Sequence, residues 1–356
     1  NNGACYTTIE MMATFTHYRV NADHQIPILD PPLKKSTENS ETYNISNSVL
    51  KNLRFEIIKL TDDEINFDLI GVDASIANAL RRIMLAEVPT IAIENVWIAI
   101  NSSIIQDEVL AHRIGLIPIR ADPSKLDFLG ADNEETDKDT IVFHFDVECL
   151  NQFSGEVKNG RKCFVNEMAL SGALTWLPQG NQASVFPEGI RPVHDDIVLA
   201  KLRPGQRIEF EAHCRKGFGK DHTKFSPAAT ASYRLLPDIV IKEPITGKAA
   251  LELKALCPMQ VFDIEDLSSP GKPIGVPTAV VRRPRDCTMC RECIRDTDKH
   301  SFGKSIELRR KADHFIFSVE SSGCIAPERI VREAIGVLGE KAKKFQMLVT
   351  EYENKI

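Results

Sequence analysis

Apolar and polar residues recur along the chain with two different periods, and these periods predict its first elements. Residues 54–60 and 65–70 have strand-like patterns on either side of an Asp-Asp turn, which predicts two strands. Between Asp73 and Pro89 the apolar residues instead recur every three or four positions. This spacing predicts a helix that Asp73 caps and that ends at or before the residue preceding Pro89.

The next segments predict a change in character. Residues 91–100 form an apolar run that indicates a strand, and residues 104–112 indicate a short helix stopped by Gly115. From about residue 121 to residue 234, turn-rich stretches separate short apolar runs, for example at 141–149 and 207–213. This alternation of turns and short runs is typical of a β-rich domain.

The C-terminal part ends in the longest predicted element. Residues 305–308 and 314–320 indicate two strands, and Pro327 is suited to the first position of a helix that runs to about Glu351. Such a helix is about 36 Å long. One face of it is marked by Ile330, Ala334, Val337, Leu338, Lys341, Phe345 and Leu348. A long helix with one apolar stripe needs a surface to cover it, from its own chain or from another.

Composition narrows the classes of protein. The 356 residues are 43% hydrophobic and 26% charged, which is ordinary for a globular chain of about two domains. The net charge of -6 and the pI of about 5.9 argue against a dedicated nucleic-acid binder, so we expect no direct sequence-specific nucleic-acid contact. No apolar stretch is long enough to span a bilayer and no signal peptide is evident, so we expect a soluble intracellular protein with no membrane contact.

Residues 1–49 are expected to form an extended, polar N-terminal arm. Its first eleven residues open on Asn1, and we expect them to be upstream or added sequence without weight in the fold.

Catalytic patterns are weak throughout the chain. Glu108 and His112 are four residues apart on a predicted helix beside Asp107, but they do not form the HExxH pattern. The neighbouring Asp and His residues at 194–196 and 221–222 are not arranged as a nucleophile with its base. Residues 216–220 lack the frame of a phosphate-binding loop. The sequence therefore predicts no catalytic residues.

The stretch CTMCREC places three cysteines at intervals of three, which is the spacing of iron–sulfur proteins. In two-cluster ferredoxins a cysteine followed by proline completes the other cluster, and this chain has one such pair at Cys257. Aligned to that pattern, positions 247, 250, 253 and 297 of one cluster all lack cysteine. The positions of the other cluster all carry it: Cys257, Cys287, Cys290 and Cys293.

This separation predicts a single [4Fe–4S] cluster with a structural role. Two alternatives stay open. Zinc could be bound by the three cysteines of CTMCREC with Cys257 or His300 as the fourth ligand, because thiolates suit zinc. The thiols could also be reduced and hold no metal. A cluster of this kind also leaves open a different class of protein, a free-standing iron–sulfur redox protein.

Five long strings carry a family resemblance. Two of them closely resemble the alpha-like subunits of cellular RNA polymerases, a family that includes bacterial alpha and its archaeal counterpart: DASIANALRRIMLAEVPTIAIE and QDEVLAHRIGLIPIRADP. Three more resemble the larger alpha-like subunit shared by eukaryotic RNA polymerases I and III: GNQASVFPEGIRPVHDDIVLAKLRPGQ, GKDHTKFSPAATASYRLLPDI and HFIFSVESSGCIAPERIVREAI. Together they cover most of residues 54–345.

The resemblance implies an α+β fold with a discontinuous dimerisation domain at residues 50–105 and 299–356. A β-rich domain is inserted at 106–241, and a small insert at 242–298 resembles a ferredoxin-like domain in a one-cluster form. The implied function is that of a non-catalytic assembly subunit of RNA polymerases I and III, in the nucleus including the nucleolus. It would pair with a smaller alpha-like subunit, and the pair would carry the largest and second-largest subunits and small assembly subunits for transcription of rRNA, tRNA and 5S rRNA.

The same resemblance implies residue roles. The inter-subunit face would comprise Ile76, Ala77, Leu80, Ile83 and Met84 of the first helix and Ile330, Ala334, Val337, Leu338, Lys341 and Phe345 of the last. Arg81 and Arg82 match the paired arginines of the family helix and would contact a large subunit. Apolar residues supply association energy at roughly 25 cal/mol per Å² buried.

Overall fold

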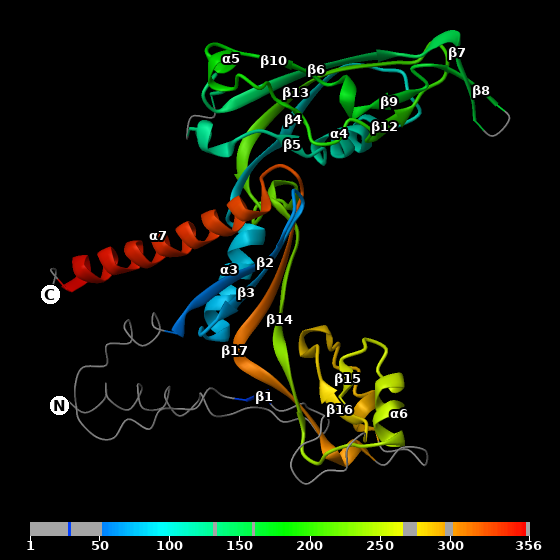
Figure 1. The fold of residues 1–356 in the computed structure, drawn as a ribbon. Coiled ribbons are helices and arrows are strands. Elements are labelled where there is room, and N and C mark those ends of the chain that lie inside the picture. The colour runs from blue at the N-terminus through cyan, green and yellow to red at the C-terminus, as the bar shows by residue number, and fades with distance from the viewer. Residues whose placement is uncertain are drawn as a thin grey trace. The chain divides into compact units, whose positions relative to one another are not determined.

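The computed structural model describes residues 28–29, 52–130, 134–158, 161–265, 276–295 and 302–353. The chain divides into two compact units. One contains residues 235–314 together with strand β1. The other contains the remaining described residues up to Arg234 and from Phe315 onward. Each unit has an apolar core of its own, and Figure 1 shows the elements of both.

A mixed sheet carries the first and last parts of the chain. Its strands are ordered β1-β17-β3-β2, and β14 also pairs with β17. Their bounds are β1 Ile28–Leu29, β2 Arg54–Leu60, β3 Glu64–Ile70, β14 Ala228–Ile241 and β17 Ile306–Ser321. Strands β14 and β17 are long enough to contribute residues to both units.

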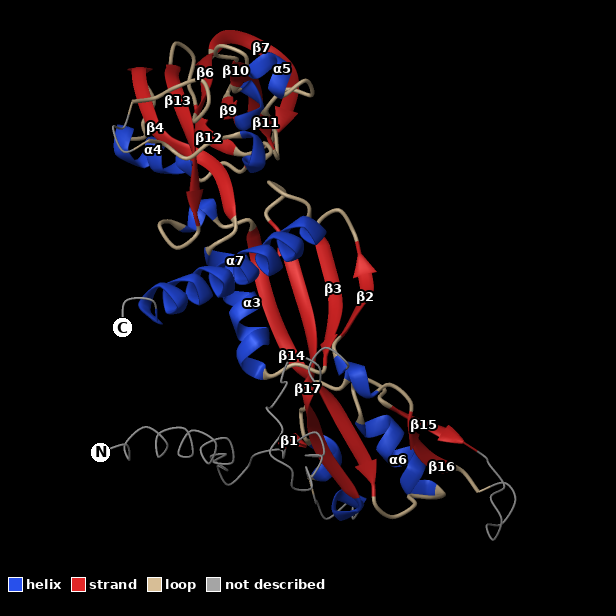
Figure 2. Ribbon diagram, turned by 90° about the vertical axis from the view of Figure 1, so that its left-hand side faces the viewer, coloured by secondary structure: helices blue, strands red, loops and turns tan. Residues whose placement is uncertain are grey.

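Two helices lie over one face of this sheet in the second unit (Figure 2). Helix α3, Ala74–Ala86, begins at Asp73, whose side chain accepts a hydrogen bond from the Ser75 backbone N–H at 2.8 Å. Helix α7, Pro327–Glu353, packs on α3 and on β3. Beneath them, Phe67 stacks on Phe317 with ring centroids 4.8 Å apart. The cap predicted at Asp73 is therefore confirmed.

The β-rich part of the second unit is built on a four-stranded sheet, ordered β10-β6-β13-β4. Helix α4, Asp107–Gly115, packs on β4, and stacked Phe145 and Phe210 lie in the core between strands. The sheet strands are β4 Pro89–Asn101, β6 Thr140–Glu148, β10 Thr175–Leu177 and β13 Arg207–Phe218. Smaller elements complete it: β5 Ile119–Arg120, β7 Leu150–Lys158, β8 Arg161–Val165, β9 Met168–Leu170, α5 Gln182–Val185, β11 Arg191–Pro192 and β12 Val198–Lys201.

The other unit holds the cysteine-rich zone. Helix α6, Lys248–Leu256, packs on the hairpin of β15, Phe262–Glu265, and β16, Thr278–Val281. Its core includes Ile239, Ala250, Leu253, Phe262 and Leu308.

The mixed α and β character that we predicted is confirmed, while three elements differ from expectation. The two strands predicted at 305–308 and 314–320 form the single strand β17. The helix predicted from residue 104 begins only at Asp107. Helix α6 was not predicted, although its residues are mostly strong helix formers. The ferredoxin-like character of residues 242–298 stays a prediction, and all of the predicted arm but β1 lies outside the described residues. None of the helices in the described ranges combines the length and apolar character that a membrane crossing requires.

Candidate functional site

Helix α3 places most of its apolar side chains in the core of its own chain. Ala77, Leu80, Ile83 and Met84 are buried, whereas Ile76 is exposed. We had expected all five to face a partner subunit. The reason for the difference is that α3 packs against α7 and lies over the same face of the sheet, so its own chain covers these four side chains. The burial of these four side chains weighs against an inter-subunit role for them, and Ile76 alone of the five lies exposed.

The paired arginines of α3 differ in their surroundings. Both the Nε and the Nη2 of Arg81 donate to the Oδ1 of Asn78, at 3.1 and 3.0 Å, and the residue is half-buried. Arg82 is exposed. An Arg82 guanidinium open to solvent can form a bidentate pair with a carboxylate of another subunit. The predicted contact with a large subunit stays a prediction.

The first half of α7 is held by its own chain. Ile330 and Ala334 are buried, and Val337 and Leu338 are half-buried. One turn further, the Nζ of Lys341 lies 2.5 Å from a carboxylate oxygen of Glu87, next to the end of α3. These predicted interface residues therefore anchor α7 on α3 before any partner is considered.

The second half of α7 presents an exposed apolar stripe. Phe345, Leu348 and Tyr352 are 71%, 54% and 68% exposed, and they recur at intervals of three and four on one helical face. Val349 lies beside them, 41% exposed. In both ribbon views this half of the helix extends past α3 (Figures 1 and 2). Exposed apolar residues grouped in this way mark an interaction site. Of these residues, Phe345 was predicted on the interface and Leu348 on the apolar stripe, whereas Val349 and Tyr352 were not predicted.

The start of α7 is fixed by an ion-pair network that sequence analysis did not find. The guanidinium of Arg329 lies 2.6 Å from Asp122 and 2.6 Å from Glu333. Burial raises the pKa of Asp122, but hydrogen bonds from Arg329 and Ser124 outweigh burial and hold that pKa well below its usual range. Only the Arg329–Glu333 pair, four residues apart on one helix, has a sequence signal.

All four predicted cysteine ligands line one cavity in the first unit. Cys287 and Cys293 are buried, Cys257 is half-buried and Cys290 is exposed. The surrounding wall is largely apolar and includes Ile239, Val261, Phe262 and Leu308. Cys257, some thirty residues earlier in the chain, therefore meets the CTMCREC loop as the spacing argument predicted.

Two left-handed residues shape the CTMCREC loop. Met289 has a φ of 60° and Arg291 a φ of 67°, conformations that side chains other than glycine rarely adopt. The first brings the Met289 backbone N–H within 3.4 Å of the Sγ of Cys287. Backbone N–H groups directed at a sulfur stabilise a thiolate or a cluster that it binds.

The electrostatics of the cavity disfavour free thiolates. Burial, together with the nearby Cys287, Cys290 and Cys257, raises the pKa of Cys293 to about 12. Without a cation, Cys293 is therefore a neutral thiol at neutral pH. A bound metal reverses this, because a coordinating thiol is deprotonated outright.

The four thiol donors and the size of the cavity that they line lead to different conclusions about which metal centre fits there. Four thiolates suit either zinc or an iron–sulfur cluster. The cavity has a volume of about 20 Å³, room for about one water-sized atom. A single ion needs less expansion of the loop than a four-iron cube. In the part of the chain that the structure describes, no three Cys, His, Asp or Glu side chains are arranged to hold a metal ion, so the thiols would have to turn inward. His300 lies outside the described residues.

The positions that lack cysteine have a structural explanation. Gly247 caps the start of α6 with a φ of 65°, and Ala250 and Leu253 are completely buried on the inner face of that helix. A helix with an apolar core thus occupies three of the four positions where a second cluster would need thiolates. Position 297 lies outside the described residues.

The weak catalytic candidates have structural surroundings. The Oδ1 of Asp107 accepts a hydrogen bond from Asn101 at 2.6 Å, at the start of α4. The Nδ1 of His222 accepts one from the Lys224 backbone N–H at 3.1 Å and caps a short turn. These contacts account for both side chains as parts of local turns and helix ends.

Comparison with known proteins matches residues 66–342 to a family model described as the RNA polymerase Rpb3/Rpb11 dimerisation domain. The chain is 46% identical over 299 residues to the "DNA-directed RNA polymerases I and III subunit RPAC1" of Homo sapiens, covering 83% of this chain and 84% of that one. It is 40% identical over 322 residues to the protein of the same name from Saccharomyces cerevisiae, covering 88% and 91%. It is 33% identical over 309 residues to the "DNA-directed RNA polymerase II subunit rpb3" of Dictyostelium discoideum, covering 83% and 94%.

Proposed function

The chain belongs to the RNA polymerase Rpb3/Rpb11 dimerisation-domain family, and from this premise we propose that it is the larger alpha-like assembly subunit of RNA polymerases I and III. It pairs with a smaller alpha-like subunit and acts in the nucleus, including the nucleolus. The protein carries out no chemistry itself. The pair is the platform on which the two large catalytic subunits and small assembly subunits gather for transcription of rRNA, tRNA and 5S rRNA.

One observation carries the pairing proposal. Beyond Lys341, which pairs with Glu87, the side chains of helix α7 are no longer covered by the rest of the chain. Phe345, Leu348 and Tyr352 lie exposed there on one face. Burial of these side chains by a partner contributes roughly 25 cal/mol per Å² of apolar surface. A single stripe of this kind suits a helix-in-groove or helix-on-helix partner. The exposed Ile76 of α3 adds a further apolar contact.

Pairing is tested by changing the stripe without touching the core. The double variant Phe345→Asp with Leu348→Asp should abolish co-purification with the smaller alpha-like subunit, because two carboxylates would be buried unpaired at the interface. The matched control is Gln346→Asp with Thr350→Asp, which adds the same two charges on exposed residues of the same helix away from the stripe. Size-exclusion chromatography of the co-expressed pair is the measurement. A pair that survives the stripe variant intact contradicts the proposal.

The four cysteines support a second proposal, that Cys257, Cys287, Cys290 and Cys293 hold a structural metal centre. When bound, a [4Fe–4S] cluster or a zinc ion would supply cross-links between thiolates, and ligand binding would become folding energy. The chain's own residues prepare the site: the left-handed turns at Met289 and Arg291 gather the loop, and the apolar wall excludes water. The cavity volume favours zinc, and the cysteine spacing favours the cluster.

Metal analysis of the full chain purified without oxygen separates these outcomes. We expect either about four irons with matching sulfide or one zinc per chain, lost in Cys287→Ser and in Cys257→Ser. Cys163→Ser, a half-buried cysteine in the β-rich part, is the control and should retain the metal. Loss of metal should also speed proteolysis within residues 235–314. A full chain without stoichiometric metal contradicts this second proposal and leaves the pairing proposal untouched.

The alternative of a free-standing iron–sulfur redox protein has no support in the comparisons. The relatives named above are polymerase subunits that match more than four fifths of the chain, whereas the cysteine motif occupies seven residues.

A further inference from the structure

The outer face of the four-stranded sheet carries an exposed tryptophan among carboxylates. Alternate residues of β6 and β13 point into the core, among them Phe143, Phe145 and Phe210, and the residues between them point outward. On the neighbouring strand β4, the side chain of Trp97 is 61% exposed. A large aromatic ring left open to water on a flat sheet face is a typical anchor of a binding surface.

Strand register places the charges beside this ring. Glu211 of β13 is the direct cross-strand neighbour of Trp97 on β4 and of His144 on β6, so the three side chains form one row across the sheet. Glu209 lies two residues along β13 on the same face. These residues border a shallow pocket of about 320 Å³, which is lined by Trp97, Ile98, Ala99, His144, Glu209, Phe210 and Glu211.

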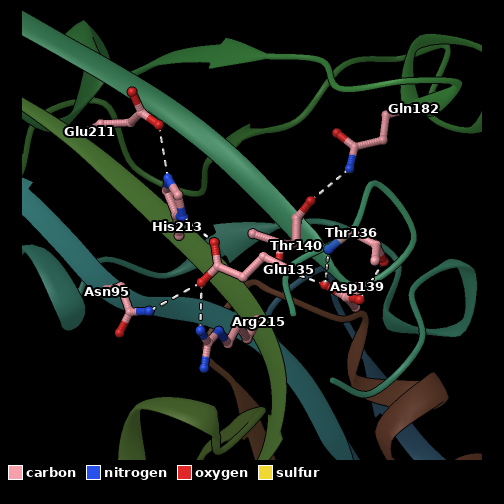
Figure 3. Close-up of polar contacts among 9 residues, drawn as sticks. All are labelled: Asn95, Glu135, Thr136, Asp139, Thr140, Gln182, Glu211, His213 and Arg215. Atoms are coloured by element: carbon pink, nitrogen blue, oxygen red, sulfur yellow. Dashed lines mark hydrogen bonds and ion pairs between the residues drawn. The ribbon is translucent and has the colours of Figure 1, made fainter. Parts of the chain in front are cut away.

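A hydrogen-bond network fixes this face in place (Figure 3). The ring of His213 lies between two carboxylates, with Nδ1 2.5 Å from Glu135 and Nε2 2.8 Å from Glu211. Arg215 holds the other oxygen of Glu135 at 2.5 Å. Burial raises the pKa of Glu135, but the hydrogen bonds from Arg215 and His213 outweigh it and keep that pKa below its usual range. Glu135 is therefore held as an ordered, charged group at neutral pH, and the contact with His213 holds the Glu211 carboxylate in place.

Negative charge exceeds positive charge on this face. The acidic side chains are Glu135, Asp146, Glu148, Glu209 and Glu211, and the guanidinium groups that β13 places among them are Arg207 and Arg215. The five carboxylates and the two guanidinium groups together carry a formal charge of -3. Arg207 is shared between Asp146 at 2.7 Å and Glu209 at 3.0 Å, so it does not neutralise both.

We propose that this face binds a lysine- or arginine-bearing segment of a protein partner, with the cation over the Trp97 ring and beside the carboxylates of Glu209 and Glu211. An exposed ring attracts a cation through its π face, and neighbouring carboxylates add to that attraction. The net negative charge disfavours nucleic acid, whose binding requires the opposite sign. The surface lies in the β-rich part of the second unit and is separate from the α7 stripe.

Binding is tested with a fluorescent nine-residue peptide of alternating arginine and serine, titrated with the full chain at low salt and followed by anisotropy. Trp97→Ala should weaken binding about threefold. Glu209→Gln with Glu211→Gln should weaken it about fivefold. The matched control is Glu188→Gln with Glu243→Gln, two exposed carboxylates elsewhere, which removes the same charge and should leave binding unchanged. All of the replaced side chains are at least partly exposed, and far-UV circular dichroism confirms that each variant folds.

Two results would overturn the proposal. One is that Trp97→Ala, the double variant Glu209→Gln with Glu211→Gln (the acidic-face pair) and the wild-type chain all bind the peptide with equal affinity. That result would mean that the peptide binds elsewhere or not at all. The other is a control pair that weakens binding as much as the acidic-face pair, which would reduce the effect to total charge. A labelled single-stranded nonanucleotide is the companion probe, and tighter binding of that probe than of the peptide would also refute the assignment.

Discussion

Asp122 and Arg329 are 207 positions apart in the sequence, yet their side chains meet at 2.6 Å and fix the point where α7 begins. Both side chains are about one third exposed, so solvent screens part of their attraction. Their value is geometric as much as energetic, because a guanidinium bound to Asp122 and to Glu333 at the same time sets the direction in which the helix leaves.

Replacing Arg329 gives a prediction with a pH signature. Arg329→Met should lower the free energy of unfolding by about 1 kcal/mol at neutral pH. The pKa of Asp122 is depressed in the folded chain, so its contribution is present above its ordinary pKa of about 3.9 and is lost as pH falls towards the folded value. The difference between variant and wild type should therefore shrink below about pH 4. Urea unfolding at pH 7 and pH 3.5 measures it.

The control for that experiment is Arg332→Met, an exposed arginine one turn along the same helix. It should change stability by less than about 0.5 kcal/mol at either pH. If both variants lose the same stability at both pH values, the Asp122 pair has no special role.

Residue-scale features with local causes were predictable, and those with distant causes were not. The Asp73 cap follows from its place before an apolar-periodic run, and the structure confirms it. The convergence of Cys257 with the CTMCREC loop followed from a known spacing pattern. The Asp122–Arg329 pair and the Trp97 face depend on strand register and chain path, for which the sequence carries no local signal.

At the scale of elements, α3 and α7 each have an apolar stripe. Part of each stripe can be covered by the chain itself, and part by a partner subunit. In α3, the chain's own sheet and α7 take nearly the whole stripe, and only Ile76 is left open. In α7 the division falls near Lys341: the first half is covered and the second half is exposed. Periodicity locates a stripe, but it does not tell which chain buries it.

This division predicts opposite results for two substitutions on one helix. Ile83→Asp should lower the free energy of unfolding by more than about 3 kcal/mol and so largely unfold the chain, because it buries an unpaired carboxylate at a side chain that is 3% exposed. Ile76→Asp should change the thermal unfolding midpoint of the chain by only a few degrees, since Ile76 is 37% exposed. Circular dichroism of the chain purified alone is the measurement. Equal stability of the two variants would contradict the assignment of Ile83 to the core.

The elements that sequence analysis missed also have physical causes. The predicted strands left out the mostly charged residues 309–313, but the strand continues through them, and Arg309 forms an ion pair with Glu307 of the same strand. Helix α6 was overlooked beside the cysteine motif, although Ala250 and Leu253 have the spacing of an inward helical face.

For the whole molecule, the polymerase strings made the family predictable because they are long and ordered along most of the chain. The matched domain, residues 66–342, contains all of α3 and the first half of α7. The discontinuous dimerisation domain at 50–105 and 299–356 stays a prediction. The division into two units falls at residues 235 and 314, outside the bounds predicted for the small insert. Only the folded structure reveals that β14 and β17 are shared by both units.

Assembly with the large subunits gives the prediction at this scale. Arg81→Glu with Arg82→Glu should leave pairing with the smaller alpha-like subunit intact and should block addition of the two large subunits, because like charges would replace arginine–carboxylate pairs. The control is Arg332→Glu with Lys343→Glu, two exposed basic residues on the face of α7 away from the stripe. Affinity purification followed by subunit quantification is the measurement. Normal recovery of the large subunits with the arginine variant would refute the contact.

The second half of α7 is the surface on which we propose that the smaller alpha-like subunit docks. Amide hydrogen exchange of residues 341–353, measured in the full chain with and without that subunit, tests it most directly. Docking on this surface should give strong additional protection of this segment in the pair, with little change in the already buried residues of α3. A stable pair in which residues 341–353 exchange as fast as in the isolated chain would contradict it.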